Sequence, residues 1–109
     1  MKRIITTFGD FHTGDEIADA VGRYGLALAR IRDTDVVDVP FVTEDGTVDR
    51  LELRIGWLVD IGIARNGRAG IAVIEPETVE QLTDHALAIE RSGVPSVEED
   101  DSWALWDEL

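Results

Sequence analysis

The chain has 109 residues, of which 44% are hydrophobic, a composition typical of one globular domain built around a single core. Its 23 Asp and Glu against 10 Lys and Arg give a net charge of −13, which disfavours general binding to nucleic acids or anionic membranes. The absence of cysteine excludes disulfides, thiolate nucleophiles and cysteine-based metal sites. No stretch is apolar enough to cross a bilayer, and no signal-peptide core follows Met1, so we expect a cytoplasmic protein.

The first third of the chain predicts a strand followed by a helix. β-branched residues favour a strand over residues 2–8. Residues 13–16, Thr-Gly-Asp-Glu, are typical of a capping box at a helix start. Apolar side chains then recur at helical spacing over residues 17–31, which predicts a helix with one buried face. Gly22 and Gly25 either weaken this helix or allow it to pack closely against a sheet.

The middle of the chain predicts two strands. Residues 36–43 favour a strand, and because Pro40 cannot donate a ladder hydrogen bond, we expect an edge strand or a bulged one. Residues 51–63 alternate apolar with polar or small residues, a run longer than the usual strand of a small domain. We therefore expect it to bend or break at Gly56 or Gly62.

A fourth strand and a second helix are expected after this run. Residues 70–75 favour the strand, and Pro76 suits the first turn of a helix. Residues 78–81 form a second capping-box pattern. We expect the helix to end near Arg91 and to be closed by Gly93.

The expected element order is β-α-β-β-β-α, which indicates an α+β two-layer sandwich with a mostly antiparallel, curved sheet and two helices. We expect one domain over residues 1–94, followed by an acidic tail over residues 95–109. The order resembles that of the ribosome hibernation factors, and this resemblance implies contact with ribosomal RNA through basic helices. The expected second helix instead carries four acids, Glu77, Glu80, Asp84 and Glu90.

Asp10 and His12 are the candidate metal ligands. Their Asp-x-His spacing after a strand resembles the first metal-binding block of the calcineurin-like metallophosphoesterases, and this resemblance implies metal-dependent phosphoester hydrolysis. The Gly-Asn-His-Asp block of that family is absent, and His85 is the only other histidine. The alternative is that His12 is a loop residue and that Asp10, with Asp15 and Glu16, stabilises the start of a helix.

Other charged residues allow more than one interpretation. Asp60 either faces solvent or is partly buried among the apolar residues beside it. Two arginine pairs, Arg23 with Arg30 and Arg50 with Arg54, each share one face of an expected element. They either bind an anion or form ion pairs with nearby acids.

The most distinctive segment is the acidic tail. Residues 75–109 hold 11 acids against one base, Arg91, whereas residues 1–74 hold 12 acids against 9 bases. Acidic segments with tryptophan dock into partner grooves, or they pack on their own domain or across a dimer interface. The candidate partner-binding residues are Glu98, Glu99, Asp100, Asp101, Trp103, Leu105, Trp106 and Leu109.

These features indicate a small, acidic, non-enzymatic regulatory protein that needs no cofactor. We expect it to bind a protein partner or a second copy of itself, through the strand of Pro40 or the tail tryptophans, and not to contact nucleic acid or membranes directly. Two alternatives stay open. One is a metal-dependent hydrolase centred on Asp10 and His12, and the other is a polyanionic mimic of nucleic acid formed by residues 75–109.

Overall fold

The chain begins with a β-hairpin. The computed structural model describes residues 1–65 and 73–96, and in it β1 (Lys2–Thr6) and β2 (Gly9–Thr13) pair antiparallel. The strand predicted over residues 2–8 is confirmed as β1, but it ends at Thr6, and β2 was not predicted. The chain turns because the Thr6 hydroxyl donates to the carbonyl of Gly9 at 2.6 Å, and because Gly9 adopts a φ of +151° that favours glycine.

The predicted first helix is confirmed as α1 (Asp15–Arg30), but the predicted capping box is wrong. Gly14 occupies the N-cap position, and no side chain caps the helix. The Thr13 hydroxyl is fully buried and donates instead to the carbonyl of Pro40 at 2.7 Å. A contact with a distant strand has therefore replaced the local one.

Strands β3 (Thr34–Val42) and β4 (Val48–Gly56) form a long hairpin. The five strands follow the order β4-β3-β2-β1-β5, so β3 is an interior strand and the predicted edge position of Pro40 is wrong. The carbonyl of Pro40 faces β2, where it accepts from Thr13, so its missing N–H faces β2 as well. The ladder between β2 and β3 is limited to His12 opposite Val42, so no ladder bond is lost at Pro40.

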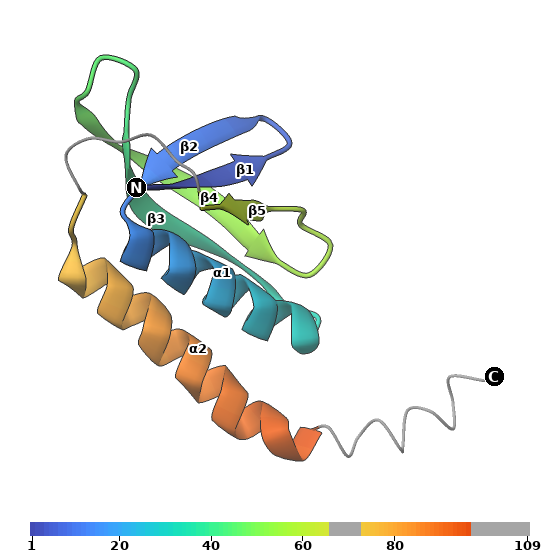
Figure 1. The fold of residues 1–109 in the computed structure, drawn as a ribbon. Helices are drawn as coiled ribbons and strands as arrows, with labels where there is room; N and C mark the ends of the chain where they lie inside the picture. Colours follow the sequence, from blue (N-terminus) through green and yellow to red (C-terminus); the bar gives the residue numbers. More distant parts are fainter. Residues whose placement is uncertain (66–72, 97–109) are drawn as a thin grey trace.

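The break predicted in residues 51–63 is confirmed at Gly56. β4 ends there with a φ of +119°, Leu58 follows with a φ of +62°, and β5 (Gly62–Ala64) pairs with β1. β4 and β5 lie at opposite edges of the sheet, although only residues 57–61 join them. The sheet must therefore curve strongly, as Figure 1 shows.

The second helix, α2 (Pro76–Ser96), begins at the predicted proline. Thr78 lies inside the helix and its hydroxyl bonds to the Glu75 carboxylate, so the capping box predicted there is wrong. The helix also continues past Gly93, because one glycine costs a helix only about 1 kcal/mol relative to alanine. Residues 73–75 form no strand, and the rest of the strand predicted over 70–75 lies outside the described residues.

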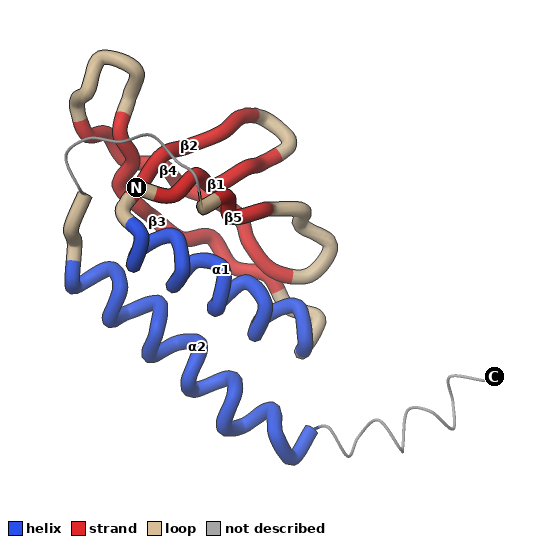
Figure 2. The backbone as a smooth tube through the Cα atoms, viewed as in Figure 1, coloured by secondary structure: helices blue, strands red, loops and turns tan. Residues whose placement is uncertain are grey.

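The predicted α+β class is confirmed: α1 packs on one face of the antiparallel sheet, and α2 packs against α1 on the same side (Figures 1 and 2). The order of the described elements is β-β-α-β-β-β-α rather than the predicted one. No helix in the described part of the chain is long and apolar enough to cross a bilayer. The core joins both helices to the sheet and consists of Ile4, Ile17, Ala18, Ala20, Val21, Tyr24, Ala27, Leu28, Val37, Val39, Leu53, Ile55, Leu82 and Ala86.

Candidate functional site

The candidate metal ligands Asp10 and His12 lie on one face of β2, since alternate residues of a strand point the same way. The alternative loop position of His12 is wrong, because β2 extends to Thr13. Arg3 lies directly opposite His12, and its Nε is 3.7 Å from a carboxylate oxygen of Asp10. This guanidinium already supplies Asp10 with a positive charge and repels a second cation at the same place.

The described part of the chain offers no other group of metal ligands. Within residues 1–65 and 73–96, no three His, Asp or Glu side chains are grouped so that they could hold a metal ion. Asp60 is exposed, so it faces solvent and is not partly buried among its apolar neighbours.

Two of the four candidate arginines form ion pairs, Arg23 with Glu90 of α2 and Arg50 with Glu75, which directly precedes α2. Arg23 donates to both carboxylate oxygens of Glu90, at 3.0 and 2.8 Å, and this hydrogen bonding lowers the pKa of Glu90. Arg50 donates to both oxygens of Glu75, at 3.0 and 3.1 Å, and to Asp38 at 3.0 Å. The bonds from Arg50 likewise lower the pKa of Glu75.

A groove of about 320 Å³ lies between α1 and the segment that links β4 to β5. Its lining contains no charged or polar side chain and consists of Gly22, Gly25, Leu26, Ala29, Gly56, Val59, Ile61 and Ile63. Ligand pockets in proteins typically begin at about 300 Å³ and are mostly apolar. The size and the lining of this groove are therefore those of a site for an apolar side chain.

Glycine on α1 keeps this groove open. A methyl group added at Gly22 would lie 3.4 Å from the Ile63 side chain, and one added at Gly25 would lie 3.6 Å from Ile55. Both are ordinary contact distances, so the packing of α1 on the sheet does not require glycine at either position. The consequence of the two glycines is a gap beside the helix.

The rim of the groove is exposed and apolar. Leu26, which lines the groove on α1, is 54% exposed. Trp57, which follows the groove residue Gly56, is 41% exposed. Exposed apolar side chains gathered beside a groove are typical of interaction surfaces.

Positive charge lies next to this apolar rim. Arg30 is exposed one helical turn after Leu26, and the Arg32 guanidinium lies over the ring of Trp57, 5.8 Å from its centre. We call Leu26, Arg30 and Arg32 the groove rim.

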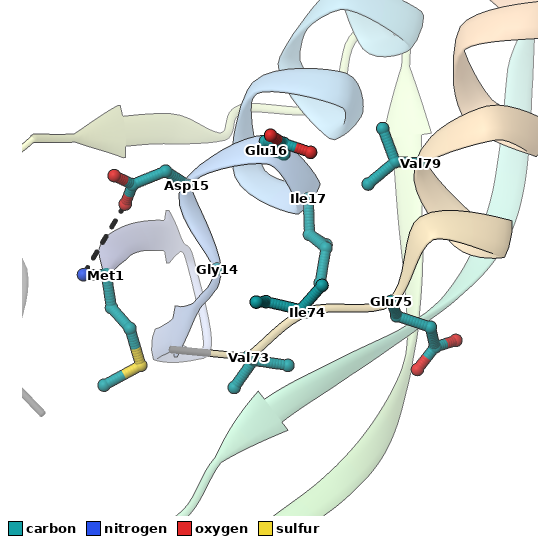
Figure 3. Close-up of a pocket in the computed structure, with 9 residues that line it drawn as sticks. All are labelled: Met1, Gly14, Asp15, Glu16, Ile17, Val73, Ile74, Glu75 and Val79. Atoms are coloured by element: carbon teal, nitrogen blue, oxygen red, sulfur yellow. Dashed lines mark ion pairs between the residues drawn. The ribbon is translucent and has the colours of Figure 1, made fainter. Parts of the chain in front are cut away.

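A second hollow of about 230 Å³ lies where the N-terminal ends of α1 and α2 meet (Figure 3). Three of its charged groups have partners: the amine of Met1 is 3.5 Å from an Asp15 oxygen, and Glu75 is held by Arg50. Gly14 is required here, because a Cβ would lie 1.9 Å from the carbonyl oxygen of Val73. This hollow is a junction between chain segments.

The candidate partner-binding residues of the acidic tail all lie outside the described residues, so their role stays a prediction: Glu98, Glu99, Asp100, Asp101, Trp103, Leu105, Trp106 and Leu109. Sequence reasoning did not single out the groove as a site. The only signals for it are the two glycines one turn apart on α1 and the break at Gly56, and both also occur in packed interfaces.

Comparisons of the chain with protein-family models, with curated proteins and with solved structures each found no match.

Proposed function

We propose that this chain is a small, non-enzymatic regulatory protein that acts through protein–protein contacts. Its binding site is the groove, and the ligand is a short acidic segment of a protein that carries large apolar side chains. The observation that supports this proposal is a groove of about 320 Å³ whose lining side chains are all apolar, bordered by an exposed leucine. No observation in the described part of the chain favours the hydrolase or the polyanionic mimic.

The site accounts for both the large apolar side chains and the acidic residues of the ligand. A large apolar side chain, tryptophan or leucine, gains by leaving water for a groove lined by apolar side chains. Acidic neighbours of that side chain would lie near Arg30 and Arg32 at the end of α1. An amphipathic segment supplies both, because it places its anchors on one face and its charges beside them.

The test is a titration with a fluorescent synthetic peptide in which acidic residues precede two tryptophans one helical turn apart. The protein is the full chain carrying Trp103→Ala and Trp106→Ala, so that its own tryptophans cannot compete. We expect saturable binding by fluorescence anisotropy. Leu26→Glu should weaken it about tenfold or more, because the substitution places a carboxylate at the groove.

Ile74→Glu is the matched control, since Ile74 is 78% exposed and lies at the hollow between the helix N-termini. It should leave the peptide affinity unchanged. The same peptide with alanine in place of both tryptophans should not bind. Equal binding to the Leu26→Glu and Ile74→Glu variants would reject the groove as the site.

A further inference from the structure

We infer that residues 97–109 of this chain occupy the groove of the same molecule and thereby regulate its access. The inference rests on the proposed function, because it takes the groove to be a binding site. It adds that residues 97–109 fill the groove when no partner is bound. A partner would then have to displace this segment.

The two helices place the start of this segment near the groove. α2 runs alongside α1 in the same direction: Tyr24 contacts His85 with ring centres 5.4 Å apart, and Arg23 pairs with Glu90. Ser96 lies six residues after Glu90 on α2. Ala29, the last residue of α1 that lines the groove, likewise lies six residues after Arg23. Measured from Arg23–Glu90, α2 ends level with Ala29, and measured from Tyr24–His85 it ends about 9 Å beyond Ala29 along α1. Figure 1 shows both helices ending at the same end of the molecule.

The chain beyond Ser96 is long enough to reach the groove. Neighbouring helix axes lie about 8–10 Å apart, so the far side of α1 is about 15–20 Å from the axis of α2. Six extended residues span about 20 Å. Residues 97–102 can therefore cross the end of α1 and bring Trp103 to the groove, with Leu105 and Trp106 close behind.

The acidic and aromatic residues of the segment follow one another in the same order as the basic and apolar surfaces along that path. Four consecutive acids, residues 98–101, come first and would pass the end of α1, where Arg30 is exposed and Arg32 lies over Trp57. The tryptophans come next and would meet the apolar lining. Opposite charges on the path and apolar groups at its end favour the segment's own groove.

The test uses the full chain with Trp57→Phe, so that Trp103 and Trp106 are the only tryptophans left to fluoresce. We expect a blue-shifted emission and an acrylamide quenching constant several-fold below that of free tryptophan. Adding Leu26→Glu should restore the emission and quenching of free tryptophan, and adding Ile74→Glu should not. Far-UV circular dichroism should show the same folded signal for all three proteins.

Three outcomes would overturn the inference. The first is free-tryptophan emission in the Trp57→Phe chain, and the second is protection that survives Leu26→Glu. The third is protection that appears only as the protein concentration rises, together with a dimer in sedimentation equilibrium, which would assign the segment to a second copy.

Competition separates this inference from the proposed function. The synthetic acidic peptide should bind the native chain more weakly than the Trp103→Ala, Trp106→Ala chain, since the attached segment must first leave. Equal affinities for the two chains would reject the self-docking and keep the groove as a binding site. Binding to neither chain would reject both proposals.

Discussion

Thr13 shows how one buried hydroxyl can join two parts of this fold. It lies at the end of β2, has no exposed surface, and donates to the carbonyl of Pro40 on β3. The ladder between these two strands is otherwise limited to one residue pair. The hydroxyl therefore links β2 to β3 at Pro40, beyond the reach of the backbone ladder.

We predict that Thr13→Val lowers the free energy of unfolding by about 1–3 kcal/mol, because it leaves the buried carbonyl of Pro40 without its donor. The shape of the side chain is nearly unchanged, so packing loss contributes little. Urea denaturation of the variant and of the wild-type chain measures the difference. Thr7→Val, at an exposed position, is the control, and an equally small effect at both positions would contradict the prediction.

Beyond the same end of β3, Asp45 stabilises the turn to β4. Its carboxylate accepts hydrogen bonds from the hydroxyls of Thr43 and Thr47 and from the amide of Thr47, and these bonds lower its pKa to about 2. Burial opposes this shift only weakly, because the group is open to solvent.

The lowered pKa of Asp45 predicts a pH dependence of stability. Because its pKa is lower in the folded than in the unfolded chain, its contribution is present above the ordinary value of 3.8 and is lost as the pH falls through about 2. The difference in unfolding free energy between the wild type and Asp45→Asn should therefore be constant above pH 5 or so and shrink below pH 4 or so. Denaturation curves from pH 2 to pH 6 or so measure it. A difference that grows on acidification would contradict the assignment.

At the scale of elements, the break between β4 and β5 determines the curvature of the sheet. Gly56 has a φ of +119°, and a Cβ at this position would lie 2.4 Å from the carbonyl oxygen of Asp33. Two constraints, one on the backbone angle and one on space, thus require glycine here. They end β4 and send the chain across to the other edge.

We predict that Gly56→Ala lowers the free energy of unfolding by about 3 kcal/mol or more, since it combines backbone strain with a backbone clash. Gly46→Ala is the matched variant, because Gly46 also has a positive φ, +90°, but nothing lies within 4 Å of its added Cβ. It should cost about 1 kcal/mol. Thermal or urea denaturation of both variants separates steric from conformational cost, and equal costs would contradict the steric part.

At the scale of the whole molecule, α2 is attached mainly through α1 and through two arginines. Leu82 and Ala86 are buried in the core, while Arg23 pairs with Glu90 and Arg50 with Glu75. Tyr24 of α1, whose ring lies beside His85, has a raised pKa, first because it is buried and then because its hydroxyl bonds to Asp35. The attachment thus combines a few buried contacts with ion pairs near the surface.

This arrangement predicts that α2 opens more easily than α1. In the double variant Arg23→Gln, Arg50→Gln, hydrogen exchange measured by mass spectrometry should become faster for α2 than for α1, because both ion pairs hold α2. Arg54→Gln is the control, since Arg54 is exposed on β4 and tests the loss of charge alone. Equal acceleration in both helices of the double variant would show that they open as one unit.

The sequence by itself predicted the features that depend on near neighbours. Helical spacing identified α1, proline identified the start of α2, and the glycine in an overlong alternating run located the end of β4. Each of these depends on local backbone geometry and on the period of burial, which residues a few positions apart determine. The order of the expected strands and helices also predicted an α+β fold, which the structure confirms.

Only the tertiary structure decided which elements meet. It placed Pro40 inside the sheet, gave the Thr13 hydroxyl a partner 27 residues away, and separated β4 from β5 by three strands. It also formed the groove from glycines on α1 and apolar residues of the β4–β5 link. Such features depend on which surfaces pack together after the chain has turned back on itself, and no local pattern encodes that choice.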